Sequence, residues 1–346
     1  MKSIVIIGGG FAGAETARGL EKFENFRVTL IDSKNYFEFT PSILRILVNP
    51  NKIKEIQIKH KNYLKKTNIV IGKVNGLGNN FIYLKNKKIK YDYLVIATGG
   101  RYSNYIKSNK EKNIVNANSS KDLLKNRKQF LKARNIGIIG GGLVGVELAG
   151  EIVENFPDKK VSIIESNKYL IYRSHIKAIK IARKFLERNK VKIILNQEAT
   201  NYSNKLIETD KSEKIPADLI FLSTGINPNS ESFKNFLSLD ENNYIKVNNH
   251  LQTNKSNIFA IGDVNDVKEE KTAQAAENQV KIAVKNIKNI EDNHQLINFN
   301  AKKRPLLLSL GKWNAILEYR SLVISGKLPA LMKYIVELKT ILKLRL

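Results

Sequence analysis

Short apolar runs recur along the chain, and the first stands at its beginning. Ser3 to Ile7 form such a run, and the glycine-rich segment Gly8 to Gly13 follows directly. An apolar run that ends in a glycine turn is typical of a strand buried in a parallel sheet. Residues 14–22 then predict a helix, and residues 27–31 predict the next strand, which ends at Asp32.

The same order of elements appears a second time. Residues 136–139 form an apolar run, and Gly140 to Gly145 repeat the glycine turn. Residues 146–155 predict the helix, and residues 160–164 predict the next strand, which ends at Glu165. A repeat of strand, turn, helix, strand and acid indicates a duplicated architecture.

A further apolar strand closes each unit and ends in a Thr-Gly turn. These strands are predicted over residues 93–96 and 219–222. The exit turns that follow contain Ala97, Thr98 and Gly99 in the first unit, and Thr224 and Gly225 in the second.

The two units predict an α/β fold of two Rossmann-like, dinucleotide-binding domains with a C-terminal helical and β appendage. After an apolar run that ends in Gly262 and Asp263, the chain is expected to return to the first domain, with a helix over about residues 272–290. We assign residues 1–104 and 232–302 to the first dinucleotide-binding domain, 105–231 to the second, and 303–346 to the appendage.

The glycine turns have the chemistry that a pyrophosphate needs. Backbone N–H groups at a helix N-terminus bind phosphate where no side chain blocks the approach. The residues expected there are Gly8, Gly10 and Gly13 in the first turn and Gly140, Gly142 and Gly145 in the second. Asp32 and Glu165 stand where a carboxylate accepts hydrogen bonds from the adenosine-ribose hydroxyls. Glu165 would repel a 2′-phosphate and so favours NADH over NADPH, although Lys168 and Arg173 nearby would weaken this preference.

The composition narrows the chemistry. The chain has 346 residues and no cysteine, so disulfides, thiolate metal sites and cysteine redox relays are excluded. The four histidines have no metal-ligand spacing, and we expect each at the surface. A formal net charge of +27 suits a polyanionic partner, although scattered, solvated lysines explain it equally well. No apolar run reaches the roughly 20 residues of a transmembrane helix, so we expect a cytoplasmic protein.

Six segments taken in order resemble the two-dinucleotide flavin oxidoreductases: GGGFAGAETARGL, TLIDSKNYFEFTP, ATGG, GGGLVGVELAGEI, STGINPNS and IFAIGDV. Over about residues 1–290 the chain looks most similar to type II NADH dehydrogenases, which are single-subunit NADH:quinone oxidoreductases, and to their apoptosis-inducing-factor-like relatives. The resemblance implies FAD at the first glycine turn, NADH at the second, and electron transfer from NADH through FAD to a quinone. Disulfide reductases and sulfide:quinone reductases need cysteines, so both are excluded.

The resemblance also implies contacts to the flavin. Thr40 and Pro41 match the loop beside the flavin, and Ala97 to Gly99 match the exit turn near FAD. Gly262 and Asp263 match a signature whose carboxylate binds the ribityl chain.

Three further residues are implied near the reacting groups. Glu147 matches a glutamate between nicotinamide and flavin, and an exposed helical carboxylate is the alternative. Gln274 would face the acceptor, and Lys271 would approach the pyrimidine end of the flavin. For these two, the alternative is an amphipathic helix start with a solvated lysine.

The last segment, from Pro329, has the pattern of a basic amphipathic helix. One side would carry Leu331, Ile335, Leu338, Leu342 and Leu346, and the opposite side Lys333, Glu337, Thr340 and Lys343. Such a helix lies in the interface of an anionic membrane, where a quinone dissolves. We therefore expect a peripheral protein on the inner face of the cell membrane, while packing on the protein's own core or in a homodimer stays open.

Two other functions stay open. A soluble NAD(P)H-dependent reductase of a small iron protein, such as ferredoxin or rubredoxin, would use the basic surface to bind an acidic carrier. A flavoprotein with a binding role, as in apoptosis-inducing relatives that touch nucleic acid, would use the +27 charge. The lysines form no recognition module, so nucleic acid is not the partner we expect.

Overall fold

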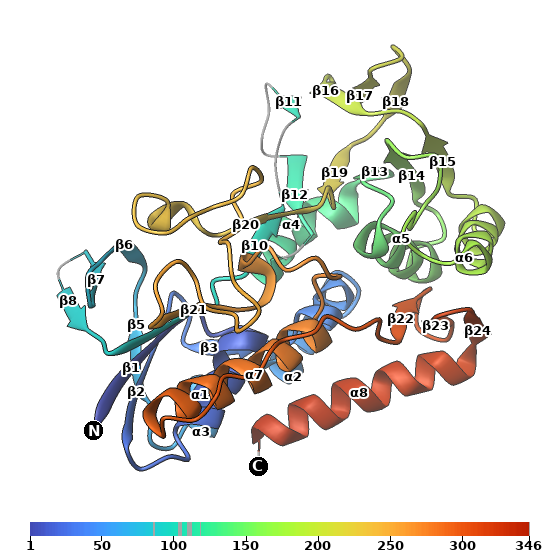
Figure 1. Cartoon of the computed structure of the whole chain (residues 1–346). Coiled ribbons are helices and arrows are strands. Elements are labelled where there is room, and N and C mark those ends of the chain that lie inside the picture. Colours follow the sequence, from blue (N-terminus) through green and yellow to red (C-terminus); the bar gives the residue numbers. More distant parts are fainter. Residues whose placement is uncertain (86, 103–105, 109–112, 118, 346) are drawn as a thin grey trace.

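Two five-stranded parallel sheets form the centre of the molecule, and a small antiparallel sheet and a long helix follow at the C-terminal end (Figure 1). The computed structural model describes the chain except for residues 86, 103–105, 109–112, 118 and 346. The predicted α/β fold with two Rossmann-like units and a C-terminal appendage is confirmed.

The first sheet has the order β21-β9-β1-β2-β5. Its strands are β21 (Ile258–Ala260), β9 (Tyr93–Ile96), β1 (Lys2–Ile7), β2 (Phe26–Asp32) and β5 (Asn68–Ile71). Alternate residues of β1 enter different cores: Ile4 and Ile6 pack on the side of helix α1 (Phe11–Leu20), whereas Val5 and Ile7 pack on the opposite side. Because β21 pairs with β9, the chain returns to this sheet after it has built the second one.

The second sheet repeats this arrangement in the order β12-β19-β13-β14-β15. Its strands are β12 (Ile114–Asn116), β19 (Leu219–Leu222), β13 (Asn135–Ile139), β14 (Lys160–Glu165) and β15 (Lys192–Leu195). In both sheets the strand before the glycine turn is central, with the exit strand on one side and the acid-bearing strand on the other. The internal repeat seen in the sequence is therefore a repeat of topology.

Helices α1 and α5 (Leu143–Asn155) follow the two glycine turns and begin three residues earlier than predicted. The reason is that Gly13 and Gly145 already lie in the first helical turn, where glycine's low helix propensity hides the start. The other long helices are α4 (Ser120–Lys132), α6 (Ile176–Arg188) and α7 (Ala273–Glu291), and α7 packs against α1.

Smaller elements surround the two sheets. In the first half they are β3 (Tyr36–Glu38), η1 (Thr40–Ile46), η2 (Pro50–Lys52), α2 (Ile53–Ile56), β4 (Gln57–Lys59), α3 (His60–Tyr63), β6 (Val74–Gly78), β7 (Phe81–Leu84) and β8 (Lys87–Lys90). Later come β10 (Gly100–Tyr102), β11 (Lys107–Ser108), β16 (Ala199–Ser203), β17 (Leu206–Thr209), β18 (Lys214–Pro216), β20 (Ile226–Pro228), η4 (Glu231–Phe233) and η5 (Gly262–Val264). Strands β10 and β20 pair antiparallel and so tie the two units together directly after their exit turns.

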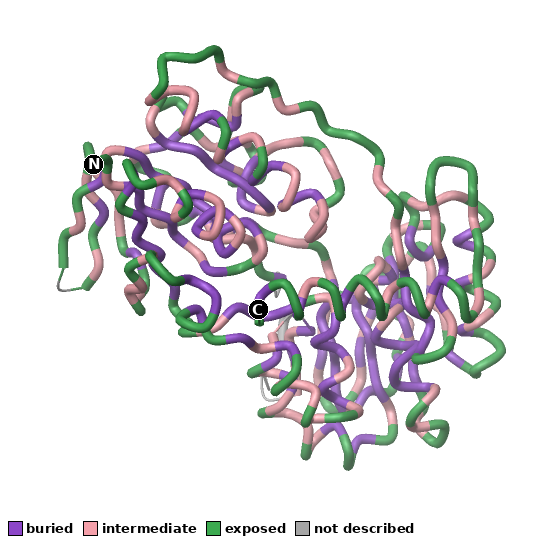
Figure 2. Tube along the Cα trace, turned by 90° about the horizontal axis from the view of Figure 1, so that it is seen from below, coloured by how far each residue is buried: buried purple, intermediate pink, exposed green. Residues whose placement is uncertain are grey.

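The appendage consists of an antiparallel sheet and helix α8 (Lys327–Arg345). The strands are β22 (Leu306–Ser309), β23 (Ala315–Tyr319) and β24 (Leu322–Gly326). Helix α8 contacts this sheet and also β4 and α3 of the first unit. Figure 2 shows α8 crossing the underside of the molecule, exposed along most of its length. Within the described residues, no helix is long and apolar enough to span a bilayer.

Candidate dinucleotide and electron-transfer site

The two glycine turns have the same backbone geometry. Gly8 and Gly140 have φ values of +100° and +102°, a conformation that favours glycine. A Cβ atom on Gly13 would lie 1.7 Å from the carbonyl oxygen of Gly8, and one on Gly145 would lie 2.0 Å from that of Gly140. The close approach of helix to strand in both units therefore requires these glycines.

The outer side of each turn is open. Gly10 and Gly142 are the N-caps of α1 and α5, and a Cβ atom on either would meet nothing within 4 Å. No described side chain caps either helix, so the first backbone N–H groups are directed at this space. A helix N-terminus beside open space fits a pyrophosphate. Both turns thus have the shape and polarity that a dinucleotide needs.

The two acids lie at the ends of β2 and β14, and both are buried. Glu165 accepts hydrogen bonds from the backbone N–H of Gly141 at 2.6 Å and from the side chain of Asn167 at 2.6 Å. Asp32 is instead 3.0 Å from Nε2 of His60, a residue with 0% exposure. The expectation that all four histidines lie at the surface is therefore wrong for His60.

The exit turn of the first unit is held by the second unit. The Thr98 hydroxyl donates to the backbone carbonyl of Asn229 at 2.8 Å, and the Asn229 side chain donates to the carbonyl of Thr98 at 2.9 Å. The backbone N–H of Asn229 also donates to the carbonyl of Gly99. The hydroxyl of Thr98 is thus engaged between the units, while Gly99 and Gly225 have open space where a Cβ would stand.

Tyr102 is buried at the end of β10, and carboxylates of both units influence it. Burial raises the pKa of Tyr102, and the carboxylates of Glu147 and Asp263 raise it further. Burial also raises the pKa of Asp263, and the nearby Lys271 ammonium opposes that shift. The charges of the predicted flavin carboxylate, Asp263, and of the predicted nicotinamide carboxylate, Glu147, therefore both act on this tyrosine.

Glu147 is held by the appendage. It accepts a hydrogen bond from the backbone N–H of Ser309 at 2.8 Å and forms an ion pair with Lys333 of α8. The Glu147 and Lys333 side chains are only 14% and 13% exposed. This geometry does not fit a solvated helical carboxylate. Lys333 and Ser309 were missed by sequence reasoning, because nothing in the local pattern links them to Glu147.

Lys271 and Gln274 lie at the start of α7, near Asp263. The Lys271 ammonium donates to the backbone carbonyls of Asn265 at 2.7 Å and Val267 at 3.2 Å. Burial lowers the pKa of Lys271, although the Asp263 carboxylate opposes this. Lys271 is therefore no solvated lysine, and its charge lies close to Asp263. Gln274 is partly buried in the first turn of α7, and its role at the acceptor stays a prediction.

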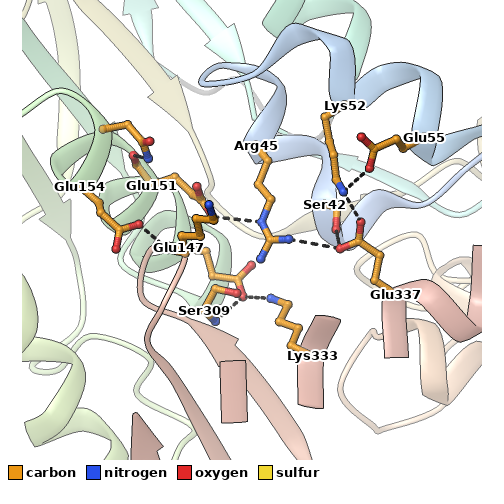
Figure 3. Close-up of polar contacts among 12 residues, drawn as sticks. Ser42, Arg45, Lys52, Glu55, Glu147, Glu151, Glu154, Ser309, Lys333 and Glu337 are labelled. Atoms are coloured by element: carbon orange, nitrogen blue, oxygen red, sulfur yellow. Dashed lines mark hydrogen bonds and ion pairs between the residues drawn. The ribbon is translucent and has the colours of Figure 1, made fainter. Parts of the chain in front are cut away.

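A second cluster, which we call the three-way network, joins both units to α8 (Figure 3). Arg45 of η1 pairs with Glu151 of α5 at 3.3 Å and with Glu337 of α8 at 3.2 Å. Lys52 and the Ser42 hydroxyl also contact Glu337, at 2.9 and 2.7 Å. The two acids are 5% and 3% exposed. In the sequence, the signal for this network is Glu337, a single acidic residue in an otherwise basic helix.

Comparison with known proteins decides the family. The model of the pyridine nucleotide-disulphide oxidoreductase family matches residues 2–280. Apoptosis-inducing factor homolog B of Dictyostelium discoideum is 32% identical over 350 residues, which cover 91% of this chain and 89% of that protein. The chain belongs to this family. It is therefore an FAD-dependent oxidoreductase that uses a pyridine nucleotide, and the two predicted cofactor classes are confirmed at that level.

Other relatives in this family agree with the resemblance. Ferroptosis suppressor protein 1 of Homo sapiens is 30% identical over 326 residues, with 89% of this chain and 86% of that protein covered. NDH2 from Plasmodium falciparum, solved in complex with NADH, has a TM-score of 0.88 at 18% identity and covers 99% and 96% of the two chains. The sulfide:quinone oxidoreductase of Aquifex aeolicus has a TM-score of 0.88 at 21% identity, with 100% and 92% covered. At these identities the two solved structures show a shared fold.

Asp263 should make the cofactor-free oxidoreductase less stable at neutral pH. Burial raises its folded-state pKa above the unfolded value, so its stabilising contribution is present below the unfolded pKa of about 3.9 and is lost as pH rises through the folded pKa. Asp263→Asn should therefore raise the Tm of the apoprotein by a few degrees at about pH 7 and give no gain at about pH 4. Thermal unfolding at both pH values measures this, with the exposed Asp158→Asn as control. A gain independent of pH would contradict the assignment.

Proposed function

We propose that the chain is a membrane-peripheral NADH:quinone oxidoreductase. In this proposal the first glycine turn and Asp32 hold FAD, and the second turn and Glu165 hold NADH. FAD, when bound, supplies the chemistry of accepting a hydride and passing electrons to a quinone. The protein binds both nucleotides at helix N-termini, and the β10–β20 pair fixes the two units to each other directly after their exit turns.

Further contacts belong to the same proposal. We propose FAD contacts for Thr40, Pro41, Ala97, Thr98, Gly99, Gly262 and Asp263, NADH contacts for Thr224 and Gly225, and an acceptor contact for Gln274. The positions of Lys271 and Asp263 support a role at the flavin, because a cation there stabilises negative charge on the ring system.

Glu165 supports NADH as the pyridine nucleotide. A carboxylate fixed at the ribose by Gly141 and Asn167 would repel a 2′-phosphate. Arg173, a cation that would attract such a phosphate, instead donates to the hydroxyl of Tyr172 at 2.9 Å and pairs with Glu270 at 3.6 Å.

The observation that carries the membrane proposal is the orientation of α8. Lys333 and Glu337 face the protein and are engaged in the contacts described above, beside the buried Ile341 and Leu344. The outward side carries six apolar side chains, Leu328, Leu331, Met332, Ile335, Leu338 and Leu342, which are 38–63% exposed, together with the exposed Lys339. We call these six side chains the outer stripe of α8. An apolar stripe of this kind suits a lipid surface.

The neighbouring hairpin extends the apolar surface. Leu322 and Ile324 of β24 are 53% and 38% exposed, and Trp313 before β23 is 59% exposed. Tryptophan is favoured at the membrane–water interface. Since Glu147 is bound to the inner side of the same helix, a docked α8 would bring the electron-transfer site to the membrane surface where quinone is dissolved.

Steady-state turnover tests this proposal. Purified protein loaded with FAD should oxidise NADH with a short-chain quinone, and turnover with a lipid-soluble quinone should need vesicles that contain anionic lipid. NADPH should be a poorer donor. Reduction of only ferredoxin or rubredoxin, with no binding to the vesicles, would overturn the proposal and favour the soluble reductase.

A further inference from the structure

The first dinucleotide-binding site, formed by Gly8 to Gly13 and Asp32, is called the first seat, and the corresponding site of the second unit is the second seat. The first seat contains a buried hydrogen-bonded chain that the proposed function leaves unexplained. Nε2 of His60 lies 3.0 Å from Oδ2 of Asp32, and Nδ1 of His60 lies 2.6 Å from the hydroxyl of Tyr63. The three residues are 0%, 7% and 6% exposed, in the order His60, Asp32 and Tyr63. Burying this many polar groups is unfavourable unless they are paired, so their arrangement calls for a reason.

The chemistry of the partners assigns the direction of each hydrogen bond. A carboxylate only accepts, so Nε2–H of His60 donates to Asp32. In a neutral imidazole Nδ1 is then the acceptor and receives the O–H of Tyr63. Burial raises the pKa of Tyr63, with the Asp32 carboxylate contributing, so this hydroxyl keeps its proton. The chain of donors runs from Tyr63 through His60 to Asp32.

The chain fixes one oxygen of Asp32 and leaves the other for a ligand. Oδ2 is the atom that His60 holds, whereas Oδ1 receives, from the described residues, only a long contact of 3.5 Å from the hydroxyl of the exposed Ser33. The glycine turn packs directly against Asp32 and His60. A Cβ atom on Gly9 would lie 2.4 Å from Oδ2 of Asp32 and 2.5 Å from Cε1 of His60. The turn, the end of β2 and α3 therefore form one packed unit.

The second seat is built differently. At Gly141, the counterpart of Gly9, a Cβ atom would lie 2.5 Å from the apolar Leu170 and 3.1 Å from Cβ of Glu165. Glu165 is held by N–H groups of Gly141 and Asn167, which lie close to it in the fold and in the sequence respectively. The buried imidazole therefore belongs to the first seat and is no general feature of the repeat.

We propose that His60, supported by Tyr63, is a positioning residue that presents the Asp32 carboxylate to the adenosine ribose and so lets the protein select FAD over flavins without adenosine. This inference rests on the proposed assignment of the first seat to FAD. A carboxylate held in one rotamer loses less entropy on binding than a free one, and a hydrogen bond to a charged group is stronger than one between neutral groups. The effect concerns the adenosine half of the ligand and leaves the isoalloxazine half unchanged.

Binding of FAD and of FMN to the apoprotein tests the inference, because FMN lacks the adenosine. Both dissociation constants are measured by flavin fluorescence. His60→Phe keeps a ring but removes the donor, and it should weaken FAD binding about 10- to 100-fold while FMN binding stays unchanged. His60→Gln, whose amide N–H substitutes for Nε2–H, should restore part of the FAD affinity. The matched control is His294→Phe at an exposed histidine.

Two further variants separate the possible failures. Tyr63→Phe removes only a hydroxyl and should lower the affinity for FAD relative to that for FMN by a few fold. This variant keeps the test valid if His60→Phe does not fold. Equal losses for FAD and FMN would reduce His60 to a structural residue and overturn the inference. If Asp32→Asn lowers the affinity for FAD relative to that for FMN and neither His60→Phe nor Tyr63→Phe does, the inference fails while the assignment of the first seat to FAD stands. If Asp32→Asn also leaves this relative affinity unchanged, the assignment itself is wrong.

Discussion

Glu147→Gln should slow the bleaching of protein-bound FAD by NADH about 100-fold, which is the effect of removing one well-placed electrostatic group from an active site. The substitution keeps the size of the side chain and removes its charge. Glu147 is fixed by Ser309 and Lys333, so its carboxylate has a defined place, and its charge acts on the buried Tyr102. Stopped-flow absorbance of the flavin, at saturating NADH, measures the change.

Glu154 supplies a matched control on the same helix. Its carboxylate also accepts a hydrogen bond from an appendage N–H, that of Lys312, but it lies two turns further along α5. Glu154→Gln should leave the rate of bleaching within about twofold, as expected for a side chain outside the site. Equal rates for Glu147→Gln and the wild-type protein would remove Glu147 from the electron-transfer site. Lys333→Met should give part of the Glu147→Gln effect, because it releases the carboxylate without removing it.

The elements that the sequence predicted well are those that local pattern determines. The run Ser3 to Ile7 and its repeat at residues 136–139 became central strands because continuous apolar runs bury well in parallel sheets. The acids Asp32 and Glu165 lie at strand ends because strand length and helix length fix their distance from the glycine turns. These relations act within a few tens of residues, and no tertiary information is needed to find them.

The sequence alone did not predict the contacts between segments that are distant along the chain. Arg45 meets Glu337 across 292 positions, and Glu147 meets Lys333 across 186. His60 stands only 28 positions from Asp32, yet its neighbours predicted neither burial nor a partner. A polar side chain is buried when the fold supplies a complementary group, and a single sequence does not contain that pairing.

In helix α8, the amphipathic pattern of the sequence does not determine which side of the helix faces the protein. The sequence placed Leu331 on an apolar side and Glu337 on a charged side, and in the structure Leu331 is exposed and Glu337 is buried, whereas Lys343, assigned to the charged side, is 49% exposed. A pattern of this kind usually directs the apolar side inward. In α8 the charged Glu337 is also directed inward, beside the apolar Ile341 and Leu344, because Arg45 and Lys52 compensate Glu337 and thereby stabilise its buried position. The orientation depends on partners contributed by η1 and η2, far away in the sequence.

The triple substitution Leu331→Ser, Ile335→Ser and Leu338→Ser should lower binding to anionic vesicles at least 100-fold. Each of these side chains is 43–54% exposed, and transfer of such a side chain into an apolar phase stabilises binding by about 1.5 kcal/mol or more. Vesicle sedimentation over a lipid titration gives the partition coefficient. Turnover with a water-soluble quinone should persist, because the three apolar side chains are exposed and form no ion pair or hydrogen bond with Glu147 or the three-way network in the described structure.

Exposed apolar residues elsewhere provide the matched control for this variant. Ile71 on β5 and Leu131 on α4 are 52% and 43% exposed, so Ile71→Ser with Leu131→Ser removes a similar kind of surface far from the outer stripe. If that control loses vesicle binding as strongly as the triple variant, the effect is general hydrophobicity and α8 is not the docking element. If the triple variant keeps full vesicle binding but changes from dimer to monomer in light scattering, the outer stripe joins two copies of the chain. Loss of vesicle binding in the triple variant, with unchanged turnover on a water-soluble quinone, supports docking through α8. The triple variant then differs from the wild-type protein only in its contact with lipid.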